Sequence, residues 1–148
     1  MTPNPDRQRG FADAPGGADN PLLEHLGIHL LDVGRDRATF EIELAERHLN
    51  RQGSLQGGVA ATMLDAACGY AGLGAGWNQP LGNAVTVMLS ISYLAKANTG
   101  RLRATGTVTR SGRSVYFASG ELTSESGELI ATAHGAFKRT TTTLPSRV

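Results

Sequence analysis

The stretch GGVAATMLDAACGYAGLGAG, residues 57–76, decides how this chain folds. It holds one charged residue, Asp65, and its apolar residues recur at the spacing of a helix. About 20 apolar residues would also span a membrane. A segment built of Gly and Ala, with an Asp near its middle and no basic flank, does not fit a membrane span. We therefore predict a soluble helix enclosed on most sides by a sheet, which the small residues allow to approach closely.

Strand patterns lie on both sides of this helix. A short helix at 20–27 is predicted first, with Asn20 as N-cap and Gly27 as the stop. Two strands follow over 28–34 and 37–44, and four more over 83–96, 101–110, 114–123 and 128–139, separated by turn residues. In the strand over 83–96 the odd positions are apolar and share one predicted face: Val85, Val87, Leu89, Ile91 and Tyr93. This order predicts the α+β class, an antiparallel sheet with a helix on one face.

Length and composition set the frame. The 148 residues suit one domain, predicted over 19–139, with a flexible N-terminal arm at 1–18 and a C-terminal tail at 140–148. One cysteine excludes an internal disulfide, and a net charge of +1 gives no electrostatic case for nucleic acid or membrane binding. With no targeting signal, we expect a cytoplasmic protein. The four histidines form no H-E-x-x-H pattern, so no metal is predicted.

Asp65 is the first candidate for chemistry. A carboxylate within an otherwise apolar helix costs free energy unless it is paired or functional. Taken alone, it is equally well read as a side chain that hydrogen-bonds a neighbouring backbone group. The polar loop 45–58, AERHLNRQGSLQGG, lies directly before the helix and favours a general base or a nucleophile.

The pair Gly57-Gly58 is the second candidate. A helix that opens on two glycines leaves N–H groups uncovered at its positive end, which suits a carbonyl oxygen that becomes an oxyanion. The alternative is a turn that needs unusual backbone angles. Asn50 in the preceding loop is able to donate to the same oxygen, while His48 and Gln52 are equally well read as solvated loop side chains.

The spacing of these candidates predicts an assembly. Gly57 and Asp65 are separated by about 12 Å along one helix, at about 1.5 Å per residue. Both groups can act on one carbonyl only if Asp65 comes from a second subunit. If the site is catalytic, we therefore expect a homodimer with two equivalent shared active sites.

A basic turn, Arg110-Ser111-Gly112-Arg113, lies between two predicted strands. Two arginines and the turn amides are suited to a phosphate, although a solvated hairpin explains the same residues. Cys68 is predicted to be a buried helix residue rather than a nucleophile, because no basic group lies near it in sequence.

The segment HLNRQGSLQGGVAATMLDAACG, followed by VTVMLSISYLAKA, resembles the hotdog-fold acyl-CoA thioesterases of the phenylacetate-pathway (PaaI) type. That family's motif is H-x-N-x-x-G-x-x-H-G-G-x-x-x-x-x-x-D. Six positions match in register: His48, Asn50, Gly53, Gly57, Gly58 and Asp65. The resemblance covers residues 20–138. It implies a long central helix wrapped by a curved antiparallel sheet, subunits paired edge to edge, and often a homotetramer.

The resemblance also assigns roles. The Gly57 N–H, helped by Asn50, would polarise the thioester carbonyl of an acyl-CoA, and Asp65 of the partner subunit would activate water or attack directly. Thr86 would lie near that water, His48 and Gly58 near the substrate, and the turn 110–113 near the phosphates of coenzyme A. No cofactor is implied. Gln56 replaces the family's usual His and cannot carry a proton at neutral pH.

Two other functions stay open at this stage. A hotdog dehydratase or hydratase would need a catalytic His in the helix region, and this helix contains none. A non-catalytic acyl-CoA binding protein is compatible with Gln56, but Asp65 favours catalysis. The acyl group cannot be read from the sequence, although Gly69, Ala71 and Gly72 indicate room beside the helix.

Overall fold

The computed structural model describes residues 20–74 and 81–141, so the predicted arm and most of the predicted tail lie outside the described residues. The elements are α1 (Pro21–Leu26), β1 (Ile28–Gly34), β2 (Arg37–Glu43), a 3-10 turn η3 (Glu46–His48), α2 (Gly57–Ala71), β3 (Asn83–Tyr93), β4 (Arg101–Ser111), β5 (Val115–Ser124) and β6 (Leu129–Thr140). Helix α2 is shorter than predicted because Gly72 caps it. Within the described ranges, no helix is long and apolar enough to cross a membrane.

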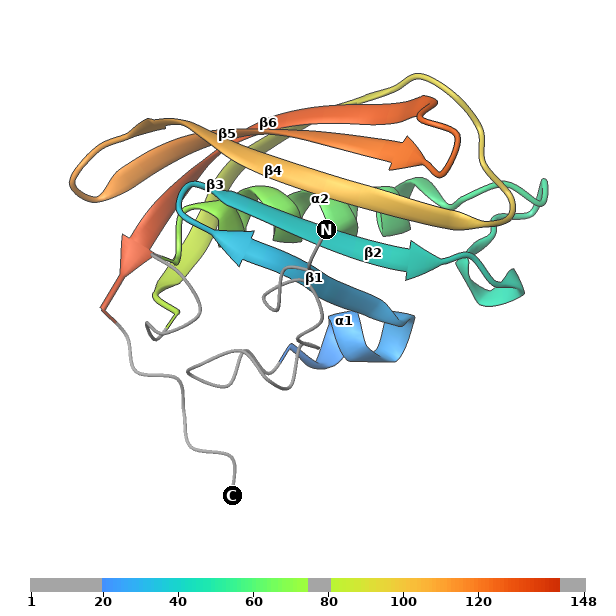
Figure 1. Ribbon diagram of the computed structural model, residues 1–148, viewed down its shortest axis with the longest axis horizontal. Helices are drawn as coiled ribbons and strands as arrows, with labels where there is room; N and C mark the ends of the chain where they lie inside the picture. The colour runs from blue at the N-terminus through green and yellow to red at the C-terminus, as the bar shows by residue number, and fades with distance from the viewer. Residues whose placement is uncertain (1–19, 75–80, 142–148) are drawn as a thin grey trace, which may run out of the picture.

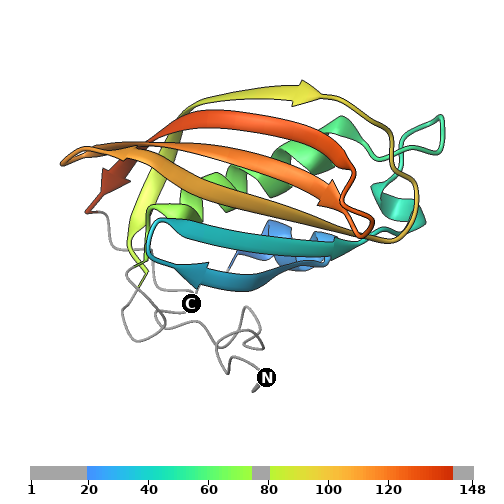
Figure 2. The same cartoon turned by 45° about the horizontal axis from the view of Figure 1, so that its top comes forward.

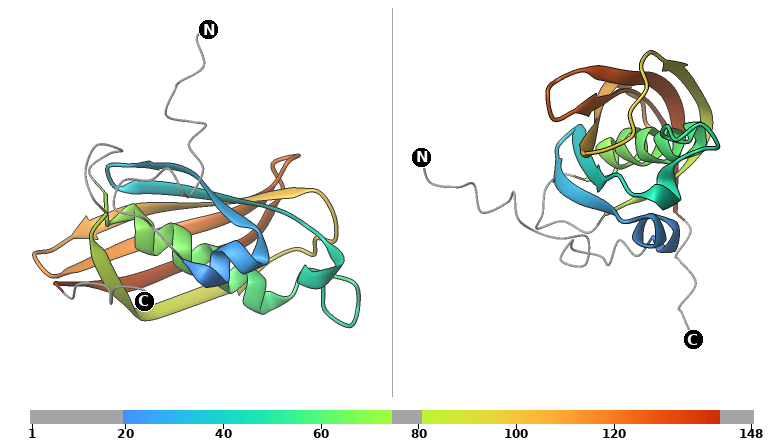
Figure 3. Two further views of the ribbon diagram at one scale, coloured as in Figure 1. Left: turned by 90° about the horizontal axis from the view of Figure 1, so that it is seen from below. Right: turned by 90° about the vertical axis from the view of Figure 1, so that its right-hand side faces the viewer.

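All six strands form one antiparallel sheet in the order β1-β2-β4-β5-β6-β3. Figure 1 shows β4, β5 and β6 above α2 and β1 and β2 lower in the view, and Figure 2 shows the curvature of the sheet. Figure 3, viewed end-on, shows the strands wrapped around α2 with α1 on the open side. This is the hotdog arrangement, so the predicted fold class is confirmed.

Small residues bring the sheet against α2, as predicted. A Cβ atom built on Gly106 of β4 would lie 2.2 Å from the backbone oxygen of Ala67, so only glycine fits between strand and helix here. The inward faces of β2 and β4 bury Phe40, Ile42 and Leu102 against the same helix. This close contact between the α2 and β4 backbones fixes the distance of α2, and therefore of Asp65, from the sheet.

Strand β3 departs from the predicted alternation. A bulge between Thr86 and Met88 leaves Val87 unpaired in the ladder with β6. One extra residue reverses the parity of a strand. Thr86 therefore pairs with the buried Phe137 on the helix side, and the prediction that Val85 and Val87 share a face with Leu89 is wrong.

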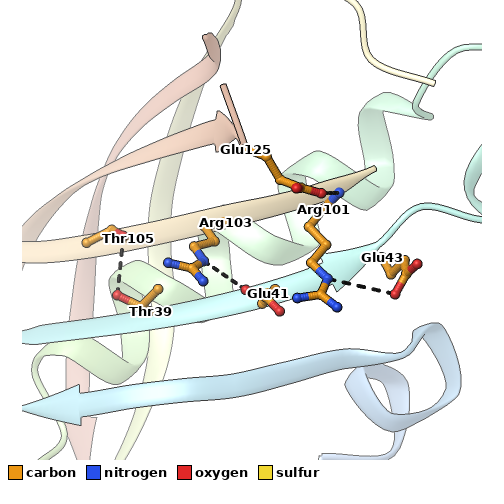
Figure 4. Close-up of polar contacts among 7 residues, drawn as sticks. All are labelled: Thr39, Glu41, Glu43, Arg101, Arg103, Thr105 and Glu125. Carbon is orange, nitrogen blue, oxygen red and sulfur yellow. Dashed lines mark hydrogen bonds and ion pairs between the residues drawn. The ribbon is translucent and has the colours of Figure 1, made fainter. Parts of the chain in front are cut away.

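The outer face of the sheet is polar where β2 and β4 meet. Figure 4 shows the cross-strand contacts, in which Arg103 Nε lies 2.8 Å from Glu41 and Arg101 Nε lies 3.9 Å from Glu43. The Thr39 and Thr105 hydroxyls lie 3.2 Å apart on the same face. Exposed ion pairs of this kind contribute about 0–1 kcal/mol each. These ion pairs indicate that the outer face of the sheet is solvated. We therefore expect the active site on the face that packs against α2.

Candidate active site

The N-terminus of α2 presents two uncovered amides. The N–H groups of a first helical turn have no acceptor within the helix, and those of Gly57 and Gly58 have no other backbone acceptor among the described residues. Neither glycine has a positive φ. A Cβ on Gly58 would meet nothing, and one on Gly57 would make ordinary contact with Tyr93 at 3.4 Å. The alternative of unusual backbone angles is therefore wrong, and the pair leaves open space beside the amides.

Asn50 lines the same pocket as Gly57. Its Oδ1 accepts from the backbone N–H of Gln52 at 2.9 Å and of Ser54 at 3.2 Å. Gly53 makes this turn possible with a φ of 76°. Because the oxygen is occupied, the side-chain NH₂ is the group left for a ligand. Asn50, Gly57 and Tyr93 line one pocket of about 250 Å³.

Tyr93 completes this end of the helix, a role that the sequence analysis did not foresee. Its hydroxyl donates to the Gly57 carbonyl at 2.8 Å. That carbonyl belongs to the same peptide group as the Gly58 N–H. Hydrogen bonds polarise one another along such a chain. Tyr93 thus holds the glycine turn and makes the solvent-facing N–H of Gly58 a stronger hydrogen-bond donor.

His48 is a buried residue of the loop rather than a solvated one. Its Nδ1 accepts from the Ala45 N–H at 2.9 Å, which leaves Nε2 to donate to the Leu26 carbonyl at 2.7 Å. The His48 carbonyl in turn accepts from the Gln56 N–H. Both ring nitrogens are occupied, so His48 ties the loop to the end of α1 in this conformation.

Gln56 is the N-cap residue of α2, but its side chain makes no capping hydrogen bond. Its carbonyl accepts from Val59 and Ala60, as the first helical turn requires. The side chain itself is exposed. It therefore lies beside the open glycine turn, free to meet a ligand or a second subunit.

Asp65 and Thr86 form the second half of the site. The Thr86 hydroxyl donates to Asp65 Oδ1 at 2.7 Å, which leaves Oδ2 of the half-buried carboxylate for another partner. The bulge in β3 makes this contact possible because it turns Thr86 toward α2. Both residues line a pocket of about 220 Å³ between α1, α2 and β3.

One chain therefore holds the predicted site residues in two separate pockets. Asn50 and Gly57 line the pocket at the start of α2, while Asp65 and Thr86 line the other. Among the described residues, none lines both pockets. The rise of a helix sets about 12 Å between positions 57 and 65, which is consistent with their lining different pockets.

The turn after β4 lies near the C-terminal end of α2, away from the glycine turn at its start. Arg110 through Arg113 are exposed, and the Gly112 N–H donates to Val115 to close the turn. Arg139, which the sequence analysis missed, holds this turn to α2 through the Ser111 hydroxyl at 2.9 Å, the Gly112 carbonyl at 3.0 Å and the Gly72 carbonyl at 3.4 Å. Only the folded sheet brings β6 next to this turn.

Behind Asp65 the interior is apolar. Burial raises the pKa of the Cys68 thiol to about 12, with a further contribution from the Asp65 charge. Burial also raises the pKa of Tyr116 to about 12, and the Arg139 guanidinium 4.5 Å from its ring centre opposes that rise. Because both pKa values are raised, Cys68 and Tyr116 are uncharged at neutral pH and act as structural groups.

The family model described as "Thioesterase superfamily" matches residues 52–131, which include the start of α2, Asp65 and Thr86. This chain belongs to the thioesterase superfamily. It is 29% identical over 106 residues to acyl-coenzyme A thioesterase 13 of Mus musculus, covering 70% of this chain and 74% of that protein.

Solved structures of PaaI proteins share the fold. The PaaI protein of the phenylacetic acid degradation operon of E. coli superposes with a TM-score of 0.75 at 23% identity, covering 84% of this chain and 88% of that one. A mutant of the phenylacetic acid degradation protein PaaI from Thermus thermophilus superposes with a TM-score of 0.72 at 25% identity, covering 82% and 100%. The resemblance to the PaaI type is thereby confirmed. Across 20–74 and 81–141, no group of three His, Cys, Asp or Glu side chains is placed to hold a metal.

Proposed function

We propose that this thioesterase-superfamily protein hydrolyses acyl-CoA thioesters to a free acid and coenzyme A. The observation that carries the proposal is the Asp65–Thr86 pair, a carboxylate with one oxygen held and one free. A group of this kind is suited to take a proton from water or to attack a carbonyl. The relative named acyl-coenzyme A thioesterase 13 supports the choice of thioester.

The glycine turn supplies the electrophilic half of the mechanism. The Gly57 N–H and the Asn50 NH₂ donate to the thioester oxygen as it becomes an oxyanion, and Gly58 adds a further donor beside them. Water then forms the new C–O bond, and Asp65 receives its proton. Collapse of the intermediate breaks the C–S bond, and the coenzyme A thiolate leaves and takes up a proton.

The two halves meet across a dimer of this chain. Strand β3 is an edge strand whose Val85, Val87 and Tyr93 are 52%, 63% and 56% exposed. A long apolar edge is a site for strand pairing with another chain. Thr86 and Tyr93 mark the two half-sites on this one strand.

A two-fold axis near Leu89 and Ser90 would therefore place Thr86 across from the partner's Tyr93. In such an antiparallel dimer each Asp65 faces the glycine turn of the other subunit. Two such dimers would form the homotetramer expected from the family resemblance.

The remaining site residues receive supporting roles. Gln56 beside the turn contacts the substrate or the partner subunit without carrying a proton. His48 acts through the loop that it anchors. Arg110 and Arg113, with the amides around Ser111 and Gly112, meet the phosphates of coenzyme A at the surface.

The test is release of coenzyme A thiol from a panel of short, long and aromatic acyl-CoAs. Asp65→Asn should lower kcat by about 10²–10⁴. Thr86→Val removes only the hydrogen bond to one carboxylate oxygen. It should therefore lower kcat far less, by about tenfold, which is the usual effect of one hydrogen bond. A wild-type protein that binds acyl-CoA without releasing thiol would identify a binding protein instead. Equal rates for wild type and Asp65→Asn would remove Asp65 from the mechanism.

A further inference from the structure

The pocket beside Asp65 is a recess with both polar and apolar lining residues. Its volume is about 220 Å³, and the polar residues that line it are Asn20, Thr62, Asp65 and Thr86. Its other lining residues come from α1, α2, β3, β6 and the segment just after α2, and they include Leu22, Gly69, Tyr70, Leu73, Ala84 and Phe137. Tyr70 is itself fixed edge-on to Phe40, with ring centres 5.0 Å apart.

We infer that this recess receives the acyl group of the substrate, and that Gly69 and Leu22 limit the size of that group. The inference rests on the proposed function, which places the thioester carbon next to Asp65. The acyl group and the coenzyme leave that carbon in different directions. A phosphate-bearing coenzyme is repelled by a carboxylate and gains nothing from an apolar wall. The exposed Arg110 and Arg113 offer it a place outside the recess.

The volume sets the class of acyl group. An apolar cavity of about 150 Å³ holds benzene, so a recess of about 220 Å³ holds by proportion about nine non-hydrogen atoms. Straight or cyclic acyl groups of about six to ten carbons fall near this limit. A sixteen-carbon chain does not fit.

Gly69 is the residue whose missing side chain makes the room. It lines the recess, and a Cβ there would lie 3.5 Å from the Phe137 ring, an ordinary contact. Alanine at this position is therefore compatible with the fold, and its methyl group would occupy space that the acyl group uses. Gly69 differs in this from Gly72, where a Cβ would lie 2.3 Å from Tyr116.

Leu22 closes the recess from α1. Its side chain is 55% exposed although it lines the pocket, so it stands at the mouth. Helix α1 is fixed at both ends: Asn20 hydrogen-bonds Tyr70, and the Leu26 carbonyl accepts from His48. A wall anchored in this way gives the recess a defined length.

The experiment measures kcat/KM for acyl-CoAs of two to sixteen carbons with wild type, Gly69→Ala, Leu22→Ala and the control Leu31→Ala. Leu31 lies on β1 and lines a surface pocket away from α2, so its variant removes the same atoms elsewhere. We expect a wild-type optimum at six to ten carbons, about tenfold lower kcat/KM of Gly69→Ala for octanoyl-CoA, and little change for butyryl-CoA. Leu22→Ala should move the optimum to longer chains, and Leu31→Ala should leave the profile as it is.

Binding of alkyl-CoA thioethers, measured by calorimetry with the same proteins, makes the test independent of hydrolysis. If thioesters are not hydrolysed but thioether affinity depends on chain length and on Gly69, the recess is an acyl site and the proposed function is wrong. If hydrolysis occurs and neither Gly69→Ala nor Leu22→Ala changes the chain-length profile, the acyl group lies elsewhere. Affinity independent of chain length in wild type would also overturn the inference.

Discussion

The sharpest prediction concerns the division of each active site between two subunits. A thioester carbon must lie within about 3–3.5 Å of its attacking atom, and its oxygen must lie at hydrogen-bond distance from the amide donors. Gly57 and Asp65 of one chain line different pockets, separated by about 12 Å of helix. The two cannot act on one carbonyl within a chain. Subunits with different defects should therefore restore one another.

The perturbation is a heterodimer of Asn50→Ala and Asp65→Asn subunits, purified through two different tags. Each parent homodimer has two defective sites, and we expect kcat to fall by about 10²–10³ in the first and about 10²–10⁴ in the second. In the heterodimer, both defects fall in one site and the other site is intact. Its activity should therefore be about half that of wild type, as two-fold symmetry requires.

The assay is thiol release from an acyl-CoA that the wild type hydrolyses. A heterodimer of Asp65→Asn with Thr86→Val is the matched control, because both defects belong to the same half-site and no intact site is formed. Its activity should be about half that of the Thr86→Val homodimer, because only one of its two sites keeps Asp65. If the Asn50→Ala and Asp65→Asn heterodimer is no more active than the mean of its parents, each site lies within one chain and the reasoning from helix geometry fails.

Three further predictions concern stability. Gly106→Ala should lower the free energy of unfolding by about 3 kcal/mol in urea denaturation, because a Cβ would lie 2.2 Å from the Ala67 oxygen; an unchanged midpoint would contradict the close contact of β4 with α2. Gly69→Ala should raise that free energy by about 0.5–1 kcal/mol, since alanine favours a helix interior and its Cβ meets only ordinary contacts; a lower melting temperature would show that the site is tighter than described. The thiol of Cys68 has a folded pKa raised from 9.0 to about 12, so its contribution is complete below pH 9 and is lost as the pH rises toward 12, by at most about 1.4 kcal/mol per pH unit. Cys68→Ala should flatten the stability profile in that alkaline range, and parallel profiles for the two proteins would contradict the raised pKa.

Much of the fold could be read from local patterns. The caps of α1 and the turns between strands are set by neighbouring residues, and each lies where it was predicted. The Gly-Ala composition of α2 correctly indicated close contact with the sheet. The pattern failed in β3, where alternation placed Val87 on the same face as Leu89. A bulge depends on how β3 pairs with β6, and no pattern within β3 alone reports that pairing.

The candidate site divides in the same way. The spacing of Gly57 and Asp65 along the helix was enough to predict that one chain does not unite them. The sequence did not show that Tyr93 holds the glycine turn or that Arg139 holds the basic turn. These contacts join residues 36 and 27 positions apart, respectively. His48 was similarly ambiguous, because its burial depends on α1, 22 positions away.

The sequence by itself determined the order of the elements, the polarity of α2 and the distance between the two candidate groups. Periodicity, capping and helical rise act over a few residues, and a single chain carries them in full. Only the tertiary structure decided which side of β3 faces α2, which residues close the recess beside Asp65, and which loop atoms stay free to donate. Those properties arise from packing between distant segments, where one inserted residue or one missing Cβ changes which side chains are in contact.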